Sequence, residues 1–464
     1  MSVSQHTVTL TLSNYLKVKY LPESFQSELT EKLTLINPKW LENERMGRWN
    51  RGTPRILKFY RQLGKAGIRI PRGYARQLLT SLKQHSLLWE FIDQRRELPP
   101  IDFEFTGRLR PFQSRAASDM LAKEFGTLCA PTGAGKTVIA LHMVARRRQP
   151  VLIIVHTKEL ALQWIRQIEA FLGIPQNQVG LWGGGRKKIG DRVTVALVQS
   201  LYKDADQVAK HVGFIIVDEC HRAPSRTFTE ALTAFDAKYM LGLSATPWRR
   251  DKLSKLIFWY LGDIYHDIKK TALVKSGDVL TLDVVSRETD FKPFHDPVQE
   301  YSRMLTELTS DDKRNRLIAE DVAREARDSA GICLVLTDRK KHAETLHLLL
   351  RYKHHIPSAI LTGELSTPQR RQVLEELNQG NVKVLVATGQ LVGEGFDCKE
   401  LSTLFLATPI RFSGRVLQYL GRVLRPAPGK TRARVYDYID VNVEVLCSAA
   451  KARQRIYSDG MGLT

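Results

Sequence analysis

The chain has 464 residues, a length that exceeds a single hydrophobic core and indicates about two to four domains. Its 70 Lys and Arg residues outnumber its 49 Asp and Glu residues, and the formal net charge of +21 is typical of proteins that bind polyanions. The five cysteines are too scattered for a disulfide framework or a zinc site. No apolar run approaches the roughly 18 residues of a membrane span, so we expect a soluble, cytoplasmic protein.

The first predicted domain, residues 1–104, is strongly basic in one segment. Between Arg45 and Arg76 the chain carries ten Lys or Arg residues and no acidic residue. A segment with one sign of charge repels itself unless an anion relieves it, so we expect nucleic-acid contacts here, with Arg48 and Arg51 among them. Interleaved aromatic residues either offer stacking surfaces to bases or form a small core: Trp49, Phe59, Tyr60 and Tyr74.

After Pro99 and Pro100, which mark a linker, short apolar runs alternate with longer helical patterns such as Lys158–Leu172. The length and β-branched content of the runs predict buried parallel strands. The alternation indicates two doubly wound α/β lobes, at residues 105–262 and 263–464. The predicted strands are Val151–Val155, Val193–Val198, Phe214–Val217 and Met240–Leu243 in the first lobe, and Ile332–Leu336, Lys383–Val386, Thr403–Leu406 and Arg434–Tyr438 in the second.

A glycine-rich stretch, Cys129–Thr137, stands between the first strand of the first lobe and an apolar helical pattern. It fits the phosphate-loop pattern, in which backbone N–H groups surround phosphates, a lysine reaches the terminal phosphates and a Ser or Thr hydroxyl binds Mg²⁺. The helix that follows would direct its positive N-terminal end at the phosphates. We assign the lysine role to Lys136 and the metal role to Thr137. The rest of the predicted loop is Pro131, Thr132, Gly133, Ala134 and Gly135.

Two adjacent carboxylates end the apolar run Phe214–Val217, where the chain continues as Asp-Glu-Cys-His. Asp218 would hold Mg²⁺ directly or through water, and Glu219 would orient and deprotonate the attacking water. A lone Asp-Glu pair is more often a solvated strand end. Its position downstream of a phosphate loop favours the catalytic interpretation.

From Arg110 to Arg425 the order of these motifs resembles that of the superfamily 2 helicases and translocases. The resemblance implies two RecA-like lobes that bind ATP between them. It also implies an adenine contact by Gln113, upstream of the phosphate loop. Ser244–Pro247 is similar to motif III, which in this family relays the nucleotide state to the nucleic-acid track.

The second lobe contains segments similar to two more motifs, Ala387–Asp397 to motif V and Gln418–Arg425 to motif VI. A cationic finger that reaches the γ-phosphate from across a cleft accelerates phosphoryl transfer by roughly 10³- to 10⁵-fold. Hydrolysis would therefore depend on closure of the two lobes. Motif V would add Gly395 and Asp397 to the nucleotide site, and motif VI would add Gln418, Arg422 and Arg425 to the catalytic residues.

Segments similar to the family's nucleic-acid motifs follow several predicted strands. They consist of helix-start amides, hydroxyls and lysines, which suit phosphates rather than base edges, so binding would be independent of sequence. Each short segment is equally compatible with an ordinary loop. The expected contacts are Thr157, Lys158, Gly184, Gln199, Ser200 and Arg250 in the first lobe and Thr388 in the second.

Within the superfamily the chain most resembles the xeroderma pigmentosum group B (XPB)-type repair helicases and the phage UvsW-like helicases. Pro247–Asp251 is similar to an element of the repair helicases, although Arg250 stands where Glu is expected. Asn37–Trp40 and Gly47–Gly52 are similar to the basic N-terminal domain of the UvsW-like proteins. The resemblance implies an ATP-dependent DNA helicase that works as a monomer on forks or junctions in repair or recombination and moves 3′ to 5′.

Two other functions would use the same residues. A double-stranded DNA translocase would move without separating strands, and a nucleic-acid clamp would keep the fold with little turnover. The clamp is disfavoured because Lys136, Asp218 and Glu219 are all present. The basic N-terminal domain would also suit a protein partner such as a nuclease. At the other end of the chain we expect the basic segment Lys451–Arg455 to be a solvated helix end.

Overall fold

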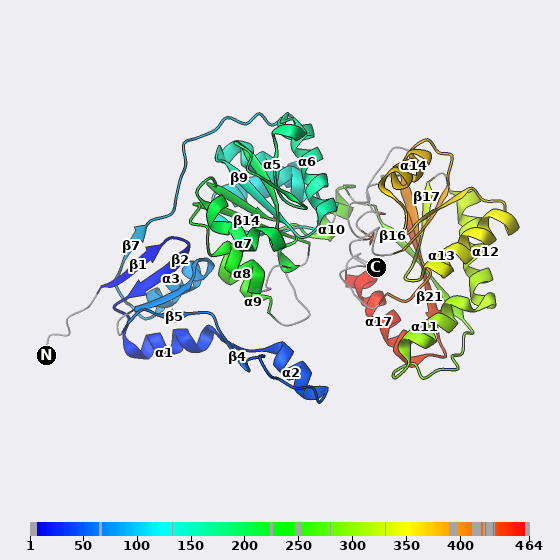
Figure 1. Cartoon of the computed structure of the whole chain (residues 1–464), viewed down its shortest axis with the longest axis horizontal. Coiled ribbons are helices and arrows are strands. Elements are labelled where there is room, and N and C mark those ends of the chain that lie inside the picture. Colours follow the sequence, from blue (N-terminus) through cyan, green and yellow to red (C-terminus); the bar gives the residue numbers. More distant parts are fainter. Residues whose placement is uncertain are drawn as a thin grey trace. The chain divides into compact units, whose positions relative to one another are not determined.

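The structure is a computed structural model of the chain. It describes residues 7–64, 67–131, 133–222, 226–245, 253–278, 280–329, 331–388, 398, 400–410, 419–420, 423, 430 and 432–459. The chain forms two compact units: Met1–Ala130 with Gly135–Ile268, and Lys269–Thr464 with Pro131–Ala134. Figure 1 shows their elements coloured along the sequence. Within the described ranges no helix has the length and apolar character needed to cross a membrane.

Alternating apolar and polar residues build the N-terminal sheet of the first unit. In β1 (Val8–Leu12) and β2 (Tyr15–Lys19) every second residue is buried, which directs one face of the sheet to the core. That face packs against α1 (Glu23–Lys32) and α3 (Ala75–Gln84). The strand order is β5-β6-β2-β1-β7, with only β1 and β7 parallel. The remaining elements are β5 (Arg61–Gln62), β6 (Gly67–Pro71), the 3₁₀ turn η1 (Arg72–Tyr74) and β7 (Trp89–Asp93).

A separate projection, residues 34–58, lies between α1 and β5, and we call it the arm. Its strands β3 (Thr34–Ile36) and β4 (Ile56–Lys58) pair antiparallel with each other and with no strand of the five-stranded sheet. Between them lies α2 (Pro38–Arg45), which contains no buried residue. Figure 1 shows α2 at the end of the arm, apart from α1 and the sheet.

The N-terminal sheet and the first lobe share a core. Leu256 and Trp259 of α9 (Lys255–Leu261) belong to the buried cluster under the N-terminal sheet. The backbones of η1 and α9 are in direct contact, because a Cβ atom on Gly73 would lie 2.4 Å from the carbonyl oxygen of Phe258. The buried Arg72 donates through Nη1 to the carbonyl oxygen of Ala237 at 2.9 Å. The basic N-terminal region is therefore packed firmly on the first lobe.

The first lobe is built on an eight-stranded sheet with the order β11-β10-β12-β9-β13-β14-β8-β15, parallel apart from β11. Every residue of β9 (Val151–Val155) and β13 (Phe214–Val217) is buried, as expected for strands covered by helices on both faces. Both predicted strands and the helix α6 (Lys158–Leu172) are confirmed. The other strands are β8 (Phe125–Cys129), β10 (Gly180–Gly183), β11 (Arg186–Lys188), β12 (Val193–Leu197), β14 (Tyr239–Ser244) and β15 (Ile264–Asp267). The other helices are α4 (Pro111–Leu121), α5 (Lys136–Arg147), η2 (Gln176–Gln178), α7 (Val198–Ala209), η3 (Cys220–Arg222) and α8 (Arg226–Leu232).

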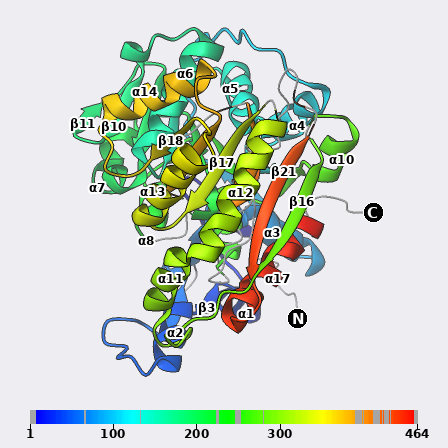
Figure 2. The ribbon, with the colours of Figure 1, turned by 90° about the vertical axis from the view of Figure 1, so that its right-hand side faces the viewer.

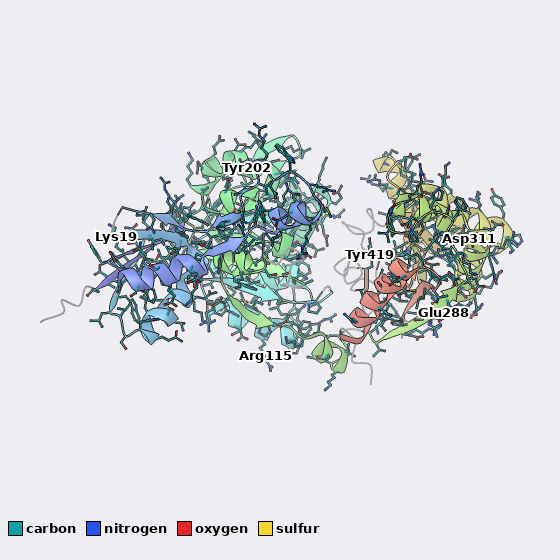
Figure 3. The ribbon with its side chains drawn as sticks, turned by 90° about the horizontal axis from the view of Figure 1, so that it is seen from below. Lys19, Arg115, Tyr202, Glu288, Asp311 and Tyr419 are labelled. Carbon is teal, nitrogen blue, oxygen red and sulfur yellow. The ribbon has the colours of Figure 1, made fainter. Side chains whose placement is uncertain are left out.

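The second lobe contains a parallel six-stranded sheet with the order β16-β21-β20-β17-β19-β18. Figure 2 shows α12 (Asp312–Asp328) and α13 (Lys340–Leu348) in front of this sheet, and their apolar residues join its core. Asp311, labelled in Figure 3, caps α12 by accepting a hydrogen bond from the Arg314 backbone. The strands are β16 (Leu282–Thr289), β17 (Ile332–Thr337), β18 (Ser358–Leu361), β19 (Val384–Thr388), β20 (Leu401–Leu406) and β21 (Ala433–Asp440). The remaining helices are α10 (Lys270–Lys275), α11 (Tyr301–Ser310), the π-helical turn η4 (Leu349–Lys353), α14 (Thr367–Asn378) and α17 (Glu444–Asp459).

The C-terminal helix corrects one expectation. We expected Lys451–Arg455 to be solvated, yet Arg453 of α17 is buried against β21. Its guanidinium donates to both oxygens of Asp437, through Nε at 2.9 Å and Nη2 at 2.7 Å, and the Tyr457 hydroxyl donates to the same carboxylate. The other four residues of the segment are exposed as expected, and the prediction is wrong for Arg453 alone, because the composition of the segment does not show which position faces the sheet.

Candidate nucleotide site and nucleic-acid track

The predicted phosphate loop connects the buried strand β8 to the N-terminus of α5. Gly133 and Gly135 have φ angles of 91° and 79°, a region that L-residues rarely adopt. A Cβ atom on Gly135 would also lie 2.4 Å from the side-chain nitrogen of Gln113, so this position excludes a side chain. Lys136 begins α5, and its ammonium donates to the carbonyl oxygen of Ala130 at 3.0 Å. The loop therefore holds this cation at the positive end of the helix.

Gln113 has a structural role in addition to the predicted adenine contact. Its side-chain oxygen accepts a hydrogen bond from the backbone of Arg110 at 2.9 Å and so caps α4. The rest of the amide lies against Gly135. The adenine contact itself stays a prediction, but its position beside the phosphate loop agrees with it.

Asp218 follows β13 and is almost fully buried. One carboxylate oxygen accepts a hydrogen bond from Trp164 Nε1 at 2.8 Å, and the other accepts one from the backbone N–H of Glu219 at 2.9 Å. Burial, followed by the negative charge of Glu219, raises the pKa of Asp218 to about 6, while Trp164 and Lys136 oppose the rise. The two hydrogen bonds fix the carboxylate, which is the kind of oxygen ligand that Mg²⁺ prefers beside phosphate oxygens and water.

Glu219 has a strained backbone, with a φ angle of 48°. Its Oε2 atom is buried and lies 3.2 Å from His221 Nδ1, and within the described part of the chain it has no hydrogen-bond partner. The same His221 nitrogen lies 3.1 Å from the hydroxyl of Ser244. His221 therefore connects the predicted catalytic carboxylate to the start of the segment similar to motif III.

The order of strands separates the predicted nucleotide residues from the predicted nucleic-acid residues. Because β10, β12, β9, β13, β14 and β8 are parallel neighbours in that order, the loops after them emerge at one edge of the sheet. At this edge lie Asp218 directly after β13, Ser244 at the end of β14 and the phosphate loop after β8. The loops after β10, β12 and β9 carry the predicted nucleic-acid contacts Gly184, Gln199, Ser200, Thr157 and Lys158.

Local contacts support this grouping. A Cβ atom on Gly184 would lie 3.8 Å from the side chain of Lys158, so the loops after β10 and β9 lie side by side. The Thr157 hydroxyl caps α6 by accepting from the backbone of Leu160. Gln199 and Ser200 lie in the first turn of α7. The helix starts are therefore in place, although no feature of the structure tests the contacts themselves.

Other predicted residues lie elsewhere. In the arm, Arg48 and Arg51 are both exposed. Thr388 ends β19 in the second unit. Seven predicted site residues fall outside the described ranges: Thr132, Arg250, Gly395, Asp397, Gln418, Arg422 and Arg425.

Sequence reasoning missed Trp164. It lies within the predicted helix Lys158–Leu172, and its indole is buried. No pattern in the sequence pairs its N–H with Asp218, because the two residues are brought together only by packing of α6 on the sheet. His221, by contrast, was part of the predicted Asp-Glu-Cys-His segment.

Comparison with known proteins agrees with this geometry. Residues 106–249 match the family model of the type III restriction enzyme res subunit, and residues 312–427 match that of the helicase conserved C-terminal domain. The chain belongs to the superfamily 2 helicases. The helicase is therefore an ATP hydrolase, as the motifs predicted.

The relatives include XPB-type proteins. The helicase is 26% identical to the DNA 3′-5′ translocase XPB2 of Sulfurisphaera tokodaii over 68% of this chain and 78% of the relative. It is 27% identical to a protein of Acanthamoeba polyphaga mimivirus named as an ATP-dependent RNA helicase, over 78% and 70% of the two chains. The solved structure of S. cerevisiae Dbp5 bound to RNA and ADP BeF3 covers 76% of this chain and 89% of its own, with 14% identity and a TM-score of 0.54. This last likeness concerns the fold, and it agrees with the prediction of two RecA-like lobes.

Proposed function

We propose that the helicase is an ATP-dependent DNA motor that acts on forked or branched DNA in repair or recombination and moves 3′ to 5′. The observation that supports the proposal is the shared sheet edge, where the residues predicted to bind nucleotide, at the ends of β13, β14 and β8, lie beside those predicted to bind nucleic acid, after β10, β12 and β9. His221 Nδ1 lies 3.1 Å from the Ser244 hydroxyl and 3.2 Å from Glu219 Oε2, between the two predicted segments. The net charge of +21 and the name of the XPB2 relative support DNA as the polymer.

In this proposal Asp218 and Thr137 would hold Mg²⁺, which would supply positive charge for the transferring phosphate. Lys136 binds the terminal phosphates, and Glu219 takes the proton of the attacking water. Arg422 and Arg425 would complete the site from the second lobe. The helicase would act as a monomer on DNA.

The test is the ATPase rate with single strands, duplexes, forks, four-way junctions and RNA. We expect DNA to stimulate ATP turnover, and forks and junctions to stimulate it most. The affinity of the protein for DNA should fall steeply as the salt concentration rises. Stimulation by RNA alone, or an affinity that does not change with salt, would contradict the proposal.

A second candidate is a translocase that moves on double-stranded DNA without separating it. The family model over residues 106–249 favours it, since that model describes the subunit of a restriction enzyme. A strand-displacement assay run beside a triplex-displacement assay distinguishes the two. A translocase would displace the third strand of a triplex and leave forked duplexes paired.

A further inference from the structure

The arm is ordered but has no hydrophobic core. Its loop is fixed by polar contacts: Asn37 donates to the carbonyl oxygen of Pro54 at 2.8 Å, and Asn43 donates to Asn50 at 3.0 Å. Asn50 in turn donates to the carbonyl oxygen of Trp40 at 3.3 Å. These contacts define the backbone, yet they bury little apolar surface. The large apolar side chains of the arm that remain exposed are Ile36, Leu41, Met46, Trp49 and Ile56.

Trp49 is the most exposed of these side chains, at 85% of its surface. The other three aromatic residues of the basic segment have a different fate. Tyr74 is buried, and Phe59 and Tyr60 pack against the core of the N-terminal sheet. The sequence allowed these aromatic residues either to form a small core or to offer stacking surfaces to bases. These three residues are part of a core, and of the four only Trp49 presents its ring to solvent.

The helix α2 carries the exposed Glu42 and Glu44, but from Arg45 to Arg76 every charged residue is basic, on both sides of Trp49. Arg48 and Arg51 flank Trp49 and are exposed. Arg55, the next cation, lies with its guanidinium carbon 5.1 Å from the centre of the Trp40 ring and adds its charge to the same arm. An exposed indole between cations is complementary to a nucleic acid, because the cations can contact its phosphates and the indole can stack on its bases. A protein partner would account for the apolar side chains alone.

We infer that the arm is a stacking element, in which the Trp49 indole packs on an unpaired base at a DNA branch point while Arg48 and Arg51 contact the adjacent phosphates. Bases in a continuous duplex are already stacked and offer no free face, so the contact selects DNA with an unpaired base. This inference rests on the proposed function and deepens that function by assigning recognition of the branch to one side chain. Leu35, in the first strand of the arm, packs against the core that the N-terminal sheet shares with α9, which attaches the arm to the first lobe.

The test is binding to a forked DNA that carries 2-aminopurine at the branch, measured without nucleotide. Stacking on the indole would quench the 2-aminopurine fluorescence. We expect Trp49→Ala to abolish the quenching and to weaken fork binding by about 5- to 100-fold, with little effect on duplex binding and no change in the salt dependence. Trp49→Phe should restore part of both signals. Arg51→Ala should instead weaken forks and duplexes alike and reduce the salt dependence by about one phosphate contact.

Phe294→Ala is the matched control, because Phe294 is 93% exposed and lies in the second unit. It should bind the fork like the wild type. The inference is overturned if Trp49→Ala binds and quenches like the wild type, which would leave the indole to a protein partner. It is also overturned if Trp49→Ala weakens duplex and fork equally. The binding assay needs no ATP, so a wild type without DNA-stimulated ATPase would count against the proposed function and leave the stacking result standing.

Discussion

At the scale of single residues, Trp164 connects a helix of the first lobe to the predicted metal ligand. Within the described part of the chain, its N–H is the one side-chain donor to Asp218, and it also lowers the pKa of that carboxyl against the effect of burial. A hydrogen bond to a charged group is worth about 1.5–3 kcal/mol, and here it fixes the direction of the carboxylate.

Trp164→Phe should therefore reduce the ATPase rate by about tenfold and raise the Mg²⁺ concentration needed for half-maximal rate, because Asp218 loses its donor. A titration of the rate against Mg²⁺ measures both effects. Trp182→Phe is the control, since Trp182 is also buried but its N–H has no partner within the described residues. Identical Mg²⁺ titrations for the two variants would show that the hydrogen bond has no role.

At the scale of elements, polar side chains hold the helices of the second lobe to its sheet. Asn315 of α12 donates to the carbonyl oxygen of Thr309, so its side-chain oxygen accepts from His342 Nε2 at 2.8 Å. The other ring nitrogen of His342 lies 2.8 Å from the hydroxyl of Thr337, at the end of β17. Burial, followed by the charge of Arg314, lowers the pKa of His342 to about 3. The neutral imidazole thus joins α12, α13 and β17.

This histidine predicts a pH dependence. The folded state keeps His342 neutral, whereas the unfolded chain binds a proton below a pH of about 6.5. The stability that it supplies is therefore present above that pH and is lost as the pH falls from about 6.5 towards 3, by about 1.4 kcal/mol per pH unit. The difference in unfolding free energy between wild type and His342→Gln should shrink accordingly in urea titrations.

The contact between α17 and β21 predicts a second stability effect. Arg453→Ala would leave the buried Asp437 carboxylate without its cation, which costs about 3–5 kcal/mol. Arg455→Ala, two residues along the same helix at an exposed position, should change stability by about 0.5 kcal/mol or less. Thermal unfolding of the two variants compares them directly. A small effect of Arg453→Ala would mean that the ion pair does not anchor the helix.

At the scale of the whole molecule, the proposed motor has to bring residues of two lobes to one nucleotide. The first lobe presents Lys136, Asp218 and Glu219 at one sheet edge, and the N-terminal sheet is packed on the same lobe. DNA held by the arm would therefore move with the first lobe. Arg422 and Arg425 lie outside the described residues, so their part in hydrolysis stays a prediction.

Arg425→Ala tests that part. We expect the variant to bind ATP normally but to lose DNA-stimulated turnover by roughly 10³-fold or more, because the transition-state charge loses its cation. Nucleotide binding and stimulated ATPase are measured on the same preparation, with Arg455→Ala as a surface control. Turnover close to that of the wild type would exclude Arg425 as the finger.

The sequence alone determined the features that depend on short stretches of chain. The phosphate loop, the Asp218–Glu219 pair and the central strands were predicted because glycine spacing, adjacent carboxylates and apolar runs are properties of neighbouring residues. Only the tertiary structure decided what surrounds them. The order of strands, the hydrogen bond from Trp164 to Asp218, the burial of Arg453 and the difference between an exposed Trp49 and a buried Tyr74 arise from contacts between distant segments. Residue type and periodicity carry no record of such contacts, because packing chooses among many partners that are locally equivalent.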